Sequence, residues 1–452
     1  MDVKPTLARQ VIGEHFGESV LADLITSRRQ FAAQLLPDLQ TALISEVFQF
    51  QAAVYGIHQE HQFLALDISR LLAGGTRSAE VAPLQFQDID VGEDEPFAGL
   101  NNGLWLFRVH EQPIAVLLSK WTDPGSKAQK FVQIEIAHLE ASSEFKRQLL
   151  WRLAQAGETS KLYRGKTLSF ESGSDYSGMR SDMLVHRLPP LSKDEVILDE
   201  RTLRRVDRHV FEFDAHREDL RRFGQSTRKG ILLYGPPGTG KTHLVRYISS
   251  NLPNHTTLLL TAEQVSNLTA YFALARALQP SILVLEDVDL VGRSRESMRS
   301  PGTEILLNRL LNEMDGLKPD ADMLFILTTN RPEDIEPALA SRPGRIDAAI
   351  EVALPDERCR ARLIELYGRA LSFEEGAVDD AAQRTEGASA AFMKELVRRL
   401  AQRSLAAGRD GTVSRDDVTA LIDEGLEDDA EIGSRLSGMG AAPRRRAAPP
   451  NC

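Results

Sequence analysis

A glycine-rich segment near the middle of the chain constrains the fold more than any other feature. Residues 235–242 read Gly-Pro-Pro-Gly-Thr-Gly-Lys-Thr, which completes the pattern G-x-x-x-x-G-K-[ST]. An apolar run at 231–234 precedes this phosphate loop and a helical pattern begins at His243, so the loop joins a strand to a helix. This context predicts an α/β domain with a parallel sheet.

The phosphate loop has the chemistry of a nucleoside triphosphate site. Its glycines let consecutive backbone N–H groups turn toward the β-phosphate, and the helix N-terminus adds partial positive charge. We expect Lys241 to reach the β- and γ-phosphates and the Thr242 hydroxyl to bind Mg²⁺. The residues expected to contact the nucleotide are Gly235, Pro236, Pro237, Gly238, Thr239, Gly240, Lys241, Thr242 and His243.

A second apolar strand begins at Ile282, and the segment 282–289 ends in the carboxylates Glu286, Asp287 and Asp289. Parallel sheets collect ligand-handling groups at the carboxyl ends of their strands. We expect one of these acids to bind Mg²⁺, directly or through water, and its neighbour to orient the attacking water.

Two further motifs, taken with the loop and the acidic strand, resemble the AAA family of ATPases. Residues 327–332 read Leu-Thr-Thr-Asn-Arg-Pro, and residues 341–347 read Ser-Arg-Pro-Gly-Arg-Ile-Asp. The resemblance covers about 196–407, roughly half the chain. It implies a Rossmann-like AAA+ ATPase domain with a C-terminal helical lid, and ATP and Mg²⁺ as cofactors.

The resemblance also implies roles for residues outside the phosphate loop. Asn330 matches the sensor-1 position, where its amide holds the lytic water near the γ-phosphate. Arg342 and Arg345 match the arginine fingers, which enter the ATP site of the neighbouring subunit. The segment 303–314 matches a helix near the subunit interface. We therefore expect a ring of identical chains, most often a hexamer in this family.

The order of the two acids departs from the usual family pattern of Asp followed by Glu. By position, Glu286 takes the metal role and Asp287 the role of catalytic base, and the shorter Asp side chain requires a small local adjustment. This inversion and the approach segment 196–224 resemble the branch that includes the mitochondrial translocase of the folded Rieske protein. The chain shows no membrane segment like that of the translocase.

The segment that threads substrate in other members also departs from the pattern. The strand at 256–260 continues directly toward a helix without an aromatic–apolar–Gly loop, and we interpret Tyr271 and Phe272 as packing residues. The loop 292–302 either faces a central channel or is simply solvated; its basic residues are Arg293, Arg295 and Arg299. No arginine stands at the sensor-2 position near 387–392.

The region before the phosphate loop indicates a mixed α/β domain. Residues 7–50 are expected to be mostly helical with a break at Pro37, and a helix is expected from Ser142 or Ser143 to about 156. Trp105, Trp121 and Trp151 are expected in the core. Strands are expected at 104–109, 114–119 and 132–136.

Helical periodicity alone remains after residue 356, with a stripe that includes Met393, Leu396 and Leu400, and an approximate capping box at Ser414 and Asp417. The expected domains are an N-terminal α/β recognition domain at 1–190, the ATPase domain at 191–355, the lid at 356–428 and a disordered tail at 429–452.

Composition narrows the function classes. The 452 residues carry a net charge of −11, which argues against nucleic acid as a partner because nucleic-acid binders need a basic surface. Two cysteines, the absence of a signal-peptide layout and the lack of a long apolar run favour a cytoplasmic protein without membrane insertion.

Three functional hypotheses remain open. The first is a protein-remodelling ATPase whose N-terminal domain selects the client. The second is a nucleic-acid remodeller, and the third is a nucleotide-switched scaffold with little turnover.

Overall fold

The computed structural model describes residues 6–58, 66–73, 78–123, 129–158, 162–170, 183–261, 264, 268–289, 312–313, 321–334 and 346–427. The chain divides into two compact units, Met1–Arg187 with Ala273–Gln279, and Leu188–Phe272 with Pro280–Cys452. Within the described ranges, no helix combines the length and the apolar character that crossing a membrane requires.

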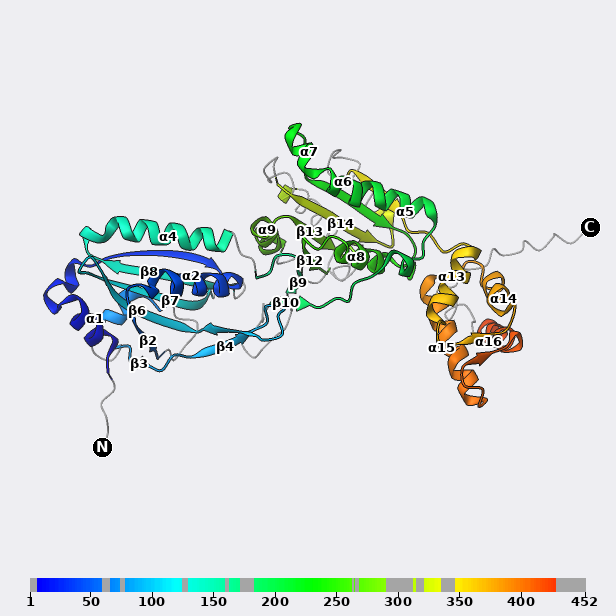
Figure 1. The fold of residues 1–452 in the computed structure, drawn as a ribbon, viewed down its shortest axis with the longest axis horizontal. Helices are drawn as coiled ribbons and strands as arrows, with labels where there is room; N and C mark the ends of the chain where they lie inside the picture. Colours follow the sequence, from blue (N-terminus) through cyan, green and yellow to red (C-terminus); the bar gives the residue numbers. More distant parts are fainter. Residues whose placement is uncertain are drawn as a thin grey trace, which may run out of the picture. The chain divides into compact units, whose positions relative to one another are not determined.

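An antiparallel sheet of order β1-β8-β7-β6-β2-β3 forms the centre of the first unit (Figure 1). Alternation along β8 sends Val132, Ile134 and Ile136 to one face and Ala137 to the other, which confirms the strand expected there. The strands are β1 (Ile25–Ala32), β2 (Ala53–Ile57), β3 (Val81–Ala82), β6 (Asn102–Val109), β7 (Gln112–Asp123) and β8 (Gln129–His138).

Helices cover both faces of this sheet. The helices α2 (Leu36–Phe48) and α4 (Ser143–Glu158) contribute to the hydrophobic cluster on one face. The helices α1 (Ala8–Phe16) and α3 (Ile68–Leu72) contribute to the cluster on the other face. Two short antiparallel pairs complete the unit: β4 (Phe86–Ile89) with β5 (Phe97–Leu100), and β9 (Thr167–Phe170) with β10 (Met183–His186).

The expectation that residues 7–50 are mostly helical is wrong at β1. All eight residues of β1 pair with β8, so long-range pairing overrides the local helical pattern. Pro37 does not break a helix but stands in the first turn of α2, where its missing N–H has no intrahelical partner to lose. Trp105 is buried as expected, whereas Trp151 is 62% exposed and does not belong to the core.

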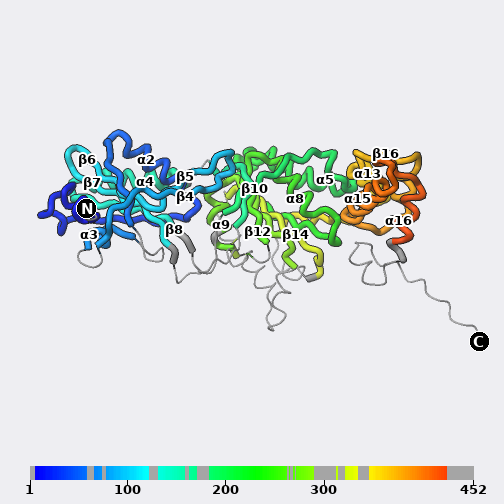
Figure 2. Tube along the Cα trace, turned by 90° about the horizontal axis from the view of Figure 1, so that it is seen from below, coloured from blue at the N-terminus to red at the C-terminus, as the bar shows by residue number. Residues whose placement is uncertain are grey.

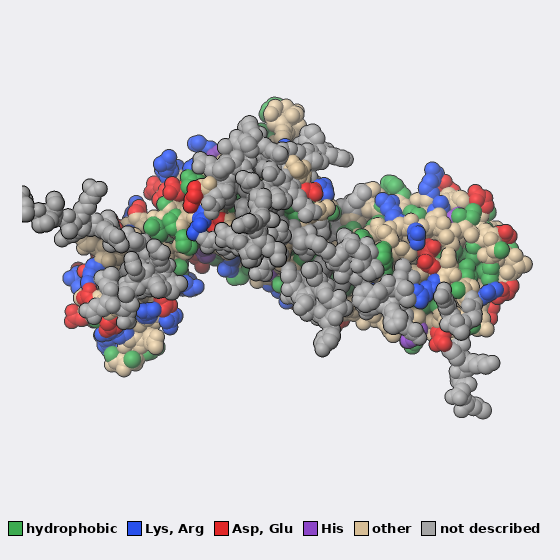
Figure 3. All heavy atoms as spheres, turned by 180° about the vertical axis from the view of Figure 1, so that it is seen from behind, with side chains coloured by type: hydrophobic (Ala, Val, Ile, Leu, Met, Phe, Trp, Pro, Cys, Tyr) green, Lys and Arg blue, Asp and Glu red, His purple; other side chains and the backbone are tan. Residues whose placement is uncertain are grey.

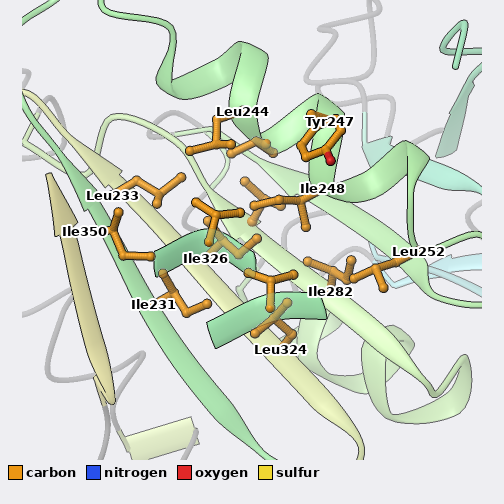
Figure 4. Close-up of a cluster of buried hydrophobic side chains, with 14 of the residues drawn as sticks. Ile231, Leu233, Leu244, Tyr247, Ile248, Leu252, Ile282, Leu324, Ile326 and Ile350 are labelled. Carbon is orange, nitrogen blue, oxygen red and sulfur yellow. The ribbon is translucent and has the colours of Figure 1, made fainter. Parts of the chain in front are cut away.

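A parallel sheet of order β12-β13-β14-β11-β15 lies in the second unit, as the sequence predicted. One face packs against α8 (Lys241–Ser250), and Figure 4 shows Leu244, Tyr247 and Ile248 of this helix above the sheet residues. The strands are β11 (Lys229–Tyr234), β12 (Thr256–Leu260), β13 (Ser281–Leu285), β14 (Met323–Thr329) and β15 (Ala348–Glu351).

Tyr271 and Phe272 lie on α9 (Leu268–Ala277) and are fully buried. The Phe272 ring stacks on Phe325 of β14 with 5.7 Å between ring centroids. Both aromatic side chains are therefore packing residues, as predicted.

The C-terminal part of the second unit is mostly helical and has its own hydrophobic core. The expectation of helix alone is wrong at one short parallel pair, β16 (Ser372–Phe373) with β17 (Thr412–Val413). The predicted stripe on α15, including Met393 and Leu400, is buried, and Ser414 and Asp417 form the predicted capping interaction. Ion pairs cover its surface, and Figure 3 shows acidic and basic side chains interspersed there. The helices, yellow to red in Figure 2, are α13 (Glu357–Tyr367), α14 (Ala377–Arg384), α15 (Ala390–Ala406) and α16 (Arg415–Glu427).

Candidate nucleotide-binding site

The phosphate loop runs from the end of β11 to the start of α8, the strand-to-helix context that its sequence predicted. Three of its glycines have positive φ: 147° at Gly235, 75° at Gly238 and 103° at Gly240. A Cβ at Gly235 would lie 2.2 Å from the carbonyl oxygen of Val352, which no real side chain tolerates. Glycine at this position is therefore a steric requirement of the loop.

Lys241 lies at the base of this loop and is only 6% exposed. Its Nζ donates to the carbonyl oxygens of Gly235 and Pro236, each at 2.8 Å. Burial lowers the pKa of Lys241, whereas the charges of Asp287 and Asp289 raise it. The loop thus wraps around a cation that stands close to the acids at the end of β13.

Glu286 follows the last residue of β13, and its Oε1 is buried without a hydrogen-bond partner. Burial raises the pKa of Glu286, a hydrogen bond from Thr242 opposes the rise, and the charge of Asp287 adds to it. An orphaned carboxylate oxygen beside a threonine hydroxyl fits Mg²⁺, which prefers hard oxygen ligands and keeps few protein ligands when bound with phosphate.

Asp287 has the left-handed backbone conformation, with φ of 49°. Its N–H donates to Thr328 Oγ1 at 3.0 Å, and the next N–H, of Val288, donates to the Thr328 carbonyl at 3.0 Å. The Asn330 amide donates from Nδ2 to Asp287 Oδ1 at 3.2 Å. The structure thus brings together the acid and the amide that the sequence expected to act on one water.

Sequence reasoning included three residues in its motifs but gave them no role in holding this arrangement. Thr328 accepts from the Asp287 backbone, while Thr329 and the Asn330 backbone both donate to the buried carboxylate of Asp289. The only sequence signal was the residue types themselves, an acid two positions after Asp287 and two threonines before Asn330.

The helical region contacts the phosphate loop through the start of α15. Ala391 N–H donates to the Gly238 carbonyl at 3.0 Å, and a Cβ at Gly238 would lie 2.9 Å from Ser389 Oγ. Ser389 caps α15 by accepting from Phe392 N–H at 3.3 Å. His243, on the other side of the loop, approaches the Glu195 carbonyl at 3.0 Å through Nε2.

Some predicted features lie outside the described residues. These include Arg342 and Arg345, the loop 292–302 with its three arginines, and the tail 429–452. Of the helix expected at 303–314, only 312–313 are described, and both are helical.

Residues 231–354 match the family model "ATPase family associated with various cellular activities (AAA)". This match takes in the phosphate loop, both acids and Asn330, so the chain contains an AAA-family ATPase domain. The fold is accordingly a mixed α/β N-terminal unit followed by an AAA+ ATPase domain.

Curated relatives match about half of the chain. The chain is 31% identical over 248 residues to "ATPase family protein 2 homolog" of Caenorhabditis elegans, a match that covers 52% of this chain and 34% of the relative. It is 32% identical over 254 residues to "Proteasome-activating nucleotidase" of Methanopyrus kandleri, covering 53% and 58% respectively. It is 34% identical over 213 residues to "26S proteasome regulatory subunit 10B" of Dictyostelium discoideum, covering 44% and 54%. The chain therefore spans less than two thirds of the length of each of these relatives.

Proposed function

We propose that this chain binds Mg-ATP at its phosphate loop, hydrolyses it, and uses the reaction to remodel or translocate protein clients. The observation that carries the proposal is the contact between Asn330 Nδ2 and Asp287 Oδ1 at 3.2 Å. It joins the base and the water-orienting amide at the sheet edge that also carries the phosphate loop, as ATP hydrolysis requires.

The chain's own groups account for each requirement of the reaction. Backbone N–H groups of residues 235–243 bind the phosphates, and Lys241 moves from the loop carbonyls to the β- and γ-phosphates. Thr242 and Glu286 would hold Mg²⁺, which would neutralise phosphate charge when bound. Asp287 accepts a proton from the attacking water while Asn330 orients that water.

A ring of identical subunits is part of the proposal. Arg342 and Arg345 enter the neighbour's site and stabilise charge on the transferring phosphoryl group. Two of these relatives have names that refer to the proteasome, which supports a protein client. In this proposal the N-terminal domain, 1–190, selects the client in the cytoplasm. The ATPase domain occupies 191–355 and the lid 356–428.

The order Glu286-Asp287 supports a place in the branch that includes the mitochondrial Rieske-protein translocase. The shorter acid at 287 also favours one alternative, a nucleotide-switched scaffold with little turnover, because the base reaches less far toward the water.

Replacing the proposed base tests the assignment. Asp287→Asn keeps the size of the side chain but removes its capacity to accept a proton, so we expect normal Mg-ATP binding and turnover at least ~100-fold slower. Steady-state phosphate release and calorimetry measure the two effects. In the control variant Glu286→Gln, we expect mainly a weakened dependence on Mg²⁺. Near-normal turnover in Asp287→Asn with loss only in Glu286→Gln would reverse the two roles, and a wild type without turnover would favour the scaffold.

A further inference from the structure

The acid at position 289 is not used by the proposed reaction, yet it is buried against the residues that are. Asp289 is only 6% exposed. Its Oδ1 accepts two hydrogen bonds at 3.0 Å, one from Thr329 Oγ1 and one from the backbone N–H of Asn330. Burying a carboxylate costs desolvation free energy. Two donors on one oxygen of Asp289 offset part of this cost, which indicates that the carboxylate has a specific structural role.

Thr329 extends this contact along the loop that follows β14. Its hydroxyl donates to Asp289 and accepts from Arg331 N–H at 3.0 Å. Bonds from Thr329 and Asn330 to one carboxylate, with Arg331 bonded back to Thr329, fix the peptide groups on both sides of Asn330. The backbone of Asn330 is therefore fixed at its Cα, and from there the side-chain amide reaches Asp287 Oδ1.

A parallel set of bonds fixes the partner of this amide. Asp287 N–H donates to Thr328 Oγ1 and Val288 N–H donates to the Thr328 carbonyl, both at 3.0 Å. Two sets of hydrogen bonds therefore join the segment after β13 to the end of β14. Thr328 binds the backbone at Asp287 and Val288. Asp289 binds Thr329 and the backbone N–H of Asn330. Only the second set, which we call the tie, depends on a charged side chain.

We propose that Asp289 is the positioning residue of the site, which holds Asn330 by its backbone and by Thr329 at the distance where its amide meets Asp287. Asp289 itself does not touch the substrate or transfer a proton. This inference rests on the proposed ATP hydrolysis, because the value of a fixed Asn330 lies in orienting water. Misplacing a catalytic group by about 1 Å can cost up to about 100-fold in rate.

The kinetic test uses Asp289→Ala and Thr329→Val, each of which removes part of the tie. We expect kcat to fall about 10-fold with KM for ATP within about two-fold, because the phosphate contacts are intact. Thr329→Ser retains the hydroxyl and is expected to keep most of the activity. The double variant Asp289→Ala/Asn330→Ala is expected to be no slower than Asn330→Ala alone, because Asp289 acts only through Asn330.

Asp417 provides the matched control. It is also 6% exposed and accepts hydrogen bonds from the Ser414 backbone and hydroxyl, but it lies in the helical region. Asp417→Ala is expected to lower the melting temperature without lowering kcat. An additive loss in the Asp289/Asn330 double variant, or a rise of KM in place of a fall of kcat, would overturn the positioning role.

Hydrogen exchange in the nucleotide-free protein tests, independently of turnover, whether Asp289 fixes the backbone at Asn330. We expect Asp289→Ala to speed exchange in the peptide that carries the Asn330 N–H by at least about 10-fold, and Asp417→Ala to leave it unchanged. If wild type hydrolysed no ATP but exchange responded as expected, the proposed function would fail while the tie would stand. Unchanged exchange in Asp289→Ala would reject the inference even in an active enzyme. Should Asp289→Ala not fold, Thr329→Val supplies the same readouts.

Discussion

The backbone at Asp287 accounts for the order of the two acids. Left-handed φ values are rare outside glycine, and Asp and Asn adopt them far more readily than longer side chains. Position 287 has φ of 49°, held there by two hydrogen bonds to Thr328. A short acid therefore suits this turn: its side chain reaches less far toward the water, but its backbone is less strained there than that of a longer residue.

When it is ionised, Glu286 is expected to lower the free energy of unfolding of the nucleotide-free protein. Its folded-state pKa is raised by burial, so the folded protein binds this proton more tightly than the unfolded chain does. The contribution of Glu286 to the free energy of unfolding is therefore largest below 4.5, its pKa in the unfolded chain. This contribution is lost as the pH rises through the pKa of the folded state.

Glu286→Gln removes this ionisable group, and we expect it to raise the melting temperature of the nucleotide-free protein at about pH 8. The gain over wild type should shrink as the pH is lowered toward about 5. Thermal unfolding across this range, without Mg²⁺, measures the difference. A lower melting temperature of Glu286→Gln than of wild type at the higher pH would contradict the claim that burying the Glu286 carboxylate costs stability.

At the scale of elements, α15 links the helical region to the phosphate loop. Its cap, Ser389, satisfies Phe392 N–H, and the Gly238 carbonyl satisfies the N–H of Ala391. Both are donors that a helix N-terminus leaves unpaired within itself. The loop therefore forms part of the cap of this helix, so the two are expected to move together.

Ser389→Ala removes the side-chain cap, and we expect a loss of about 1 kcal/mol in the free energy of unfolding. Because Gly238 belongs to the nucleotide loop, saturating Mg-ATP should recover part of the loss. Chemical denaturation with and without nucleotide measures both quantities. Ser414→Ala, which removes the cap residue of α16, is the control and should show no recovery.

Elements with strong local patterns were predictable, and elements fixed by distant contacts were not. The parallel sheet and α15 follow from apolar runs and a clear stripe, and the phosphate loop from its glycines and lysine. By contrast, β1 is a strand because it pairs with β8, and no pattern within Ile25–Ala32 predicts that pairing. The same is true within the site. The role of Asp289 and Thr329 depends on a contact between two segments distant in sequence, so neither segment alone predicts it.

At the scale of the whole molecule, the proposed arginine fingers require assembly. Arg342 and Arg345 act on a neighbour's ATP, so each Arg→Ala variant should bind ATP but lose turnover. Mixing Arg345→Ala with an excess of Lys241→Ala should restore some activity, because intact arginines then meet intact ATP sites. Wild-type specific activity should also rise with protein concentration. A monomer with concentration-independent activity and no recovery on mixing would leave a solitary nucleotide switch.

The central claim, that residues 235–243 form the site where ATP binds, is tested most directly by calorimetric titration of wild type and Lys241→Ala with Mg-ATP. Lys241 supplies the loop's cation, and its Nζ is bonded only to loop carbonyls among the described contacts, so phosphates can recruit it. We expect saturable binding to wild type and no measurable binding to Lys241→Ala at the same concentrations. Binding to the variant within a few-fold of wild type would contradict the assignment.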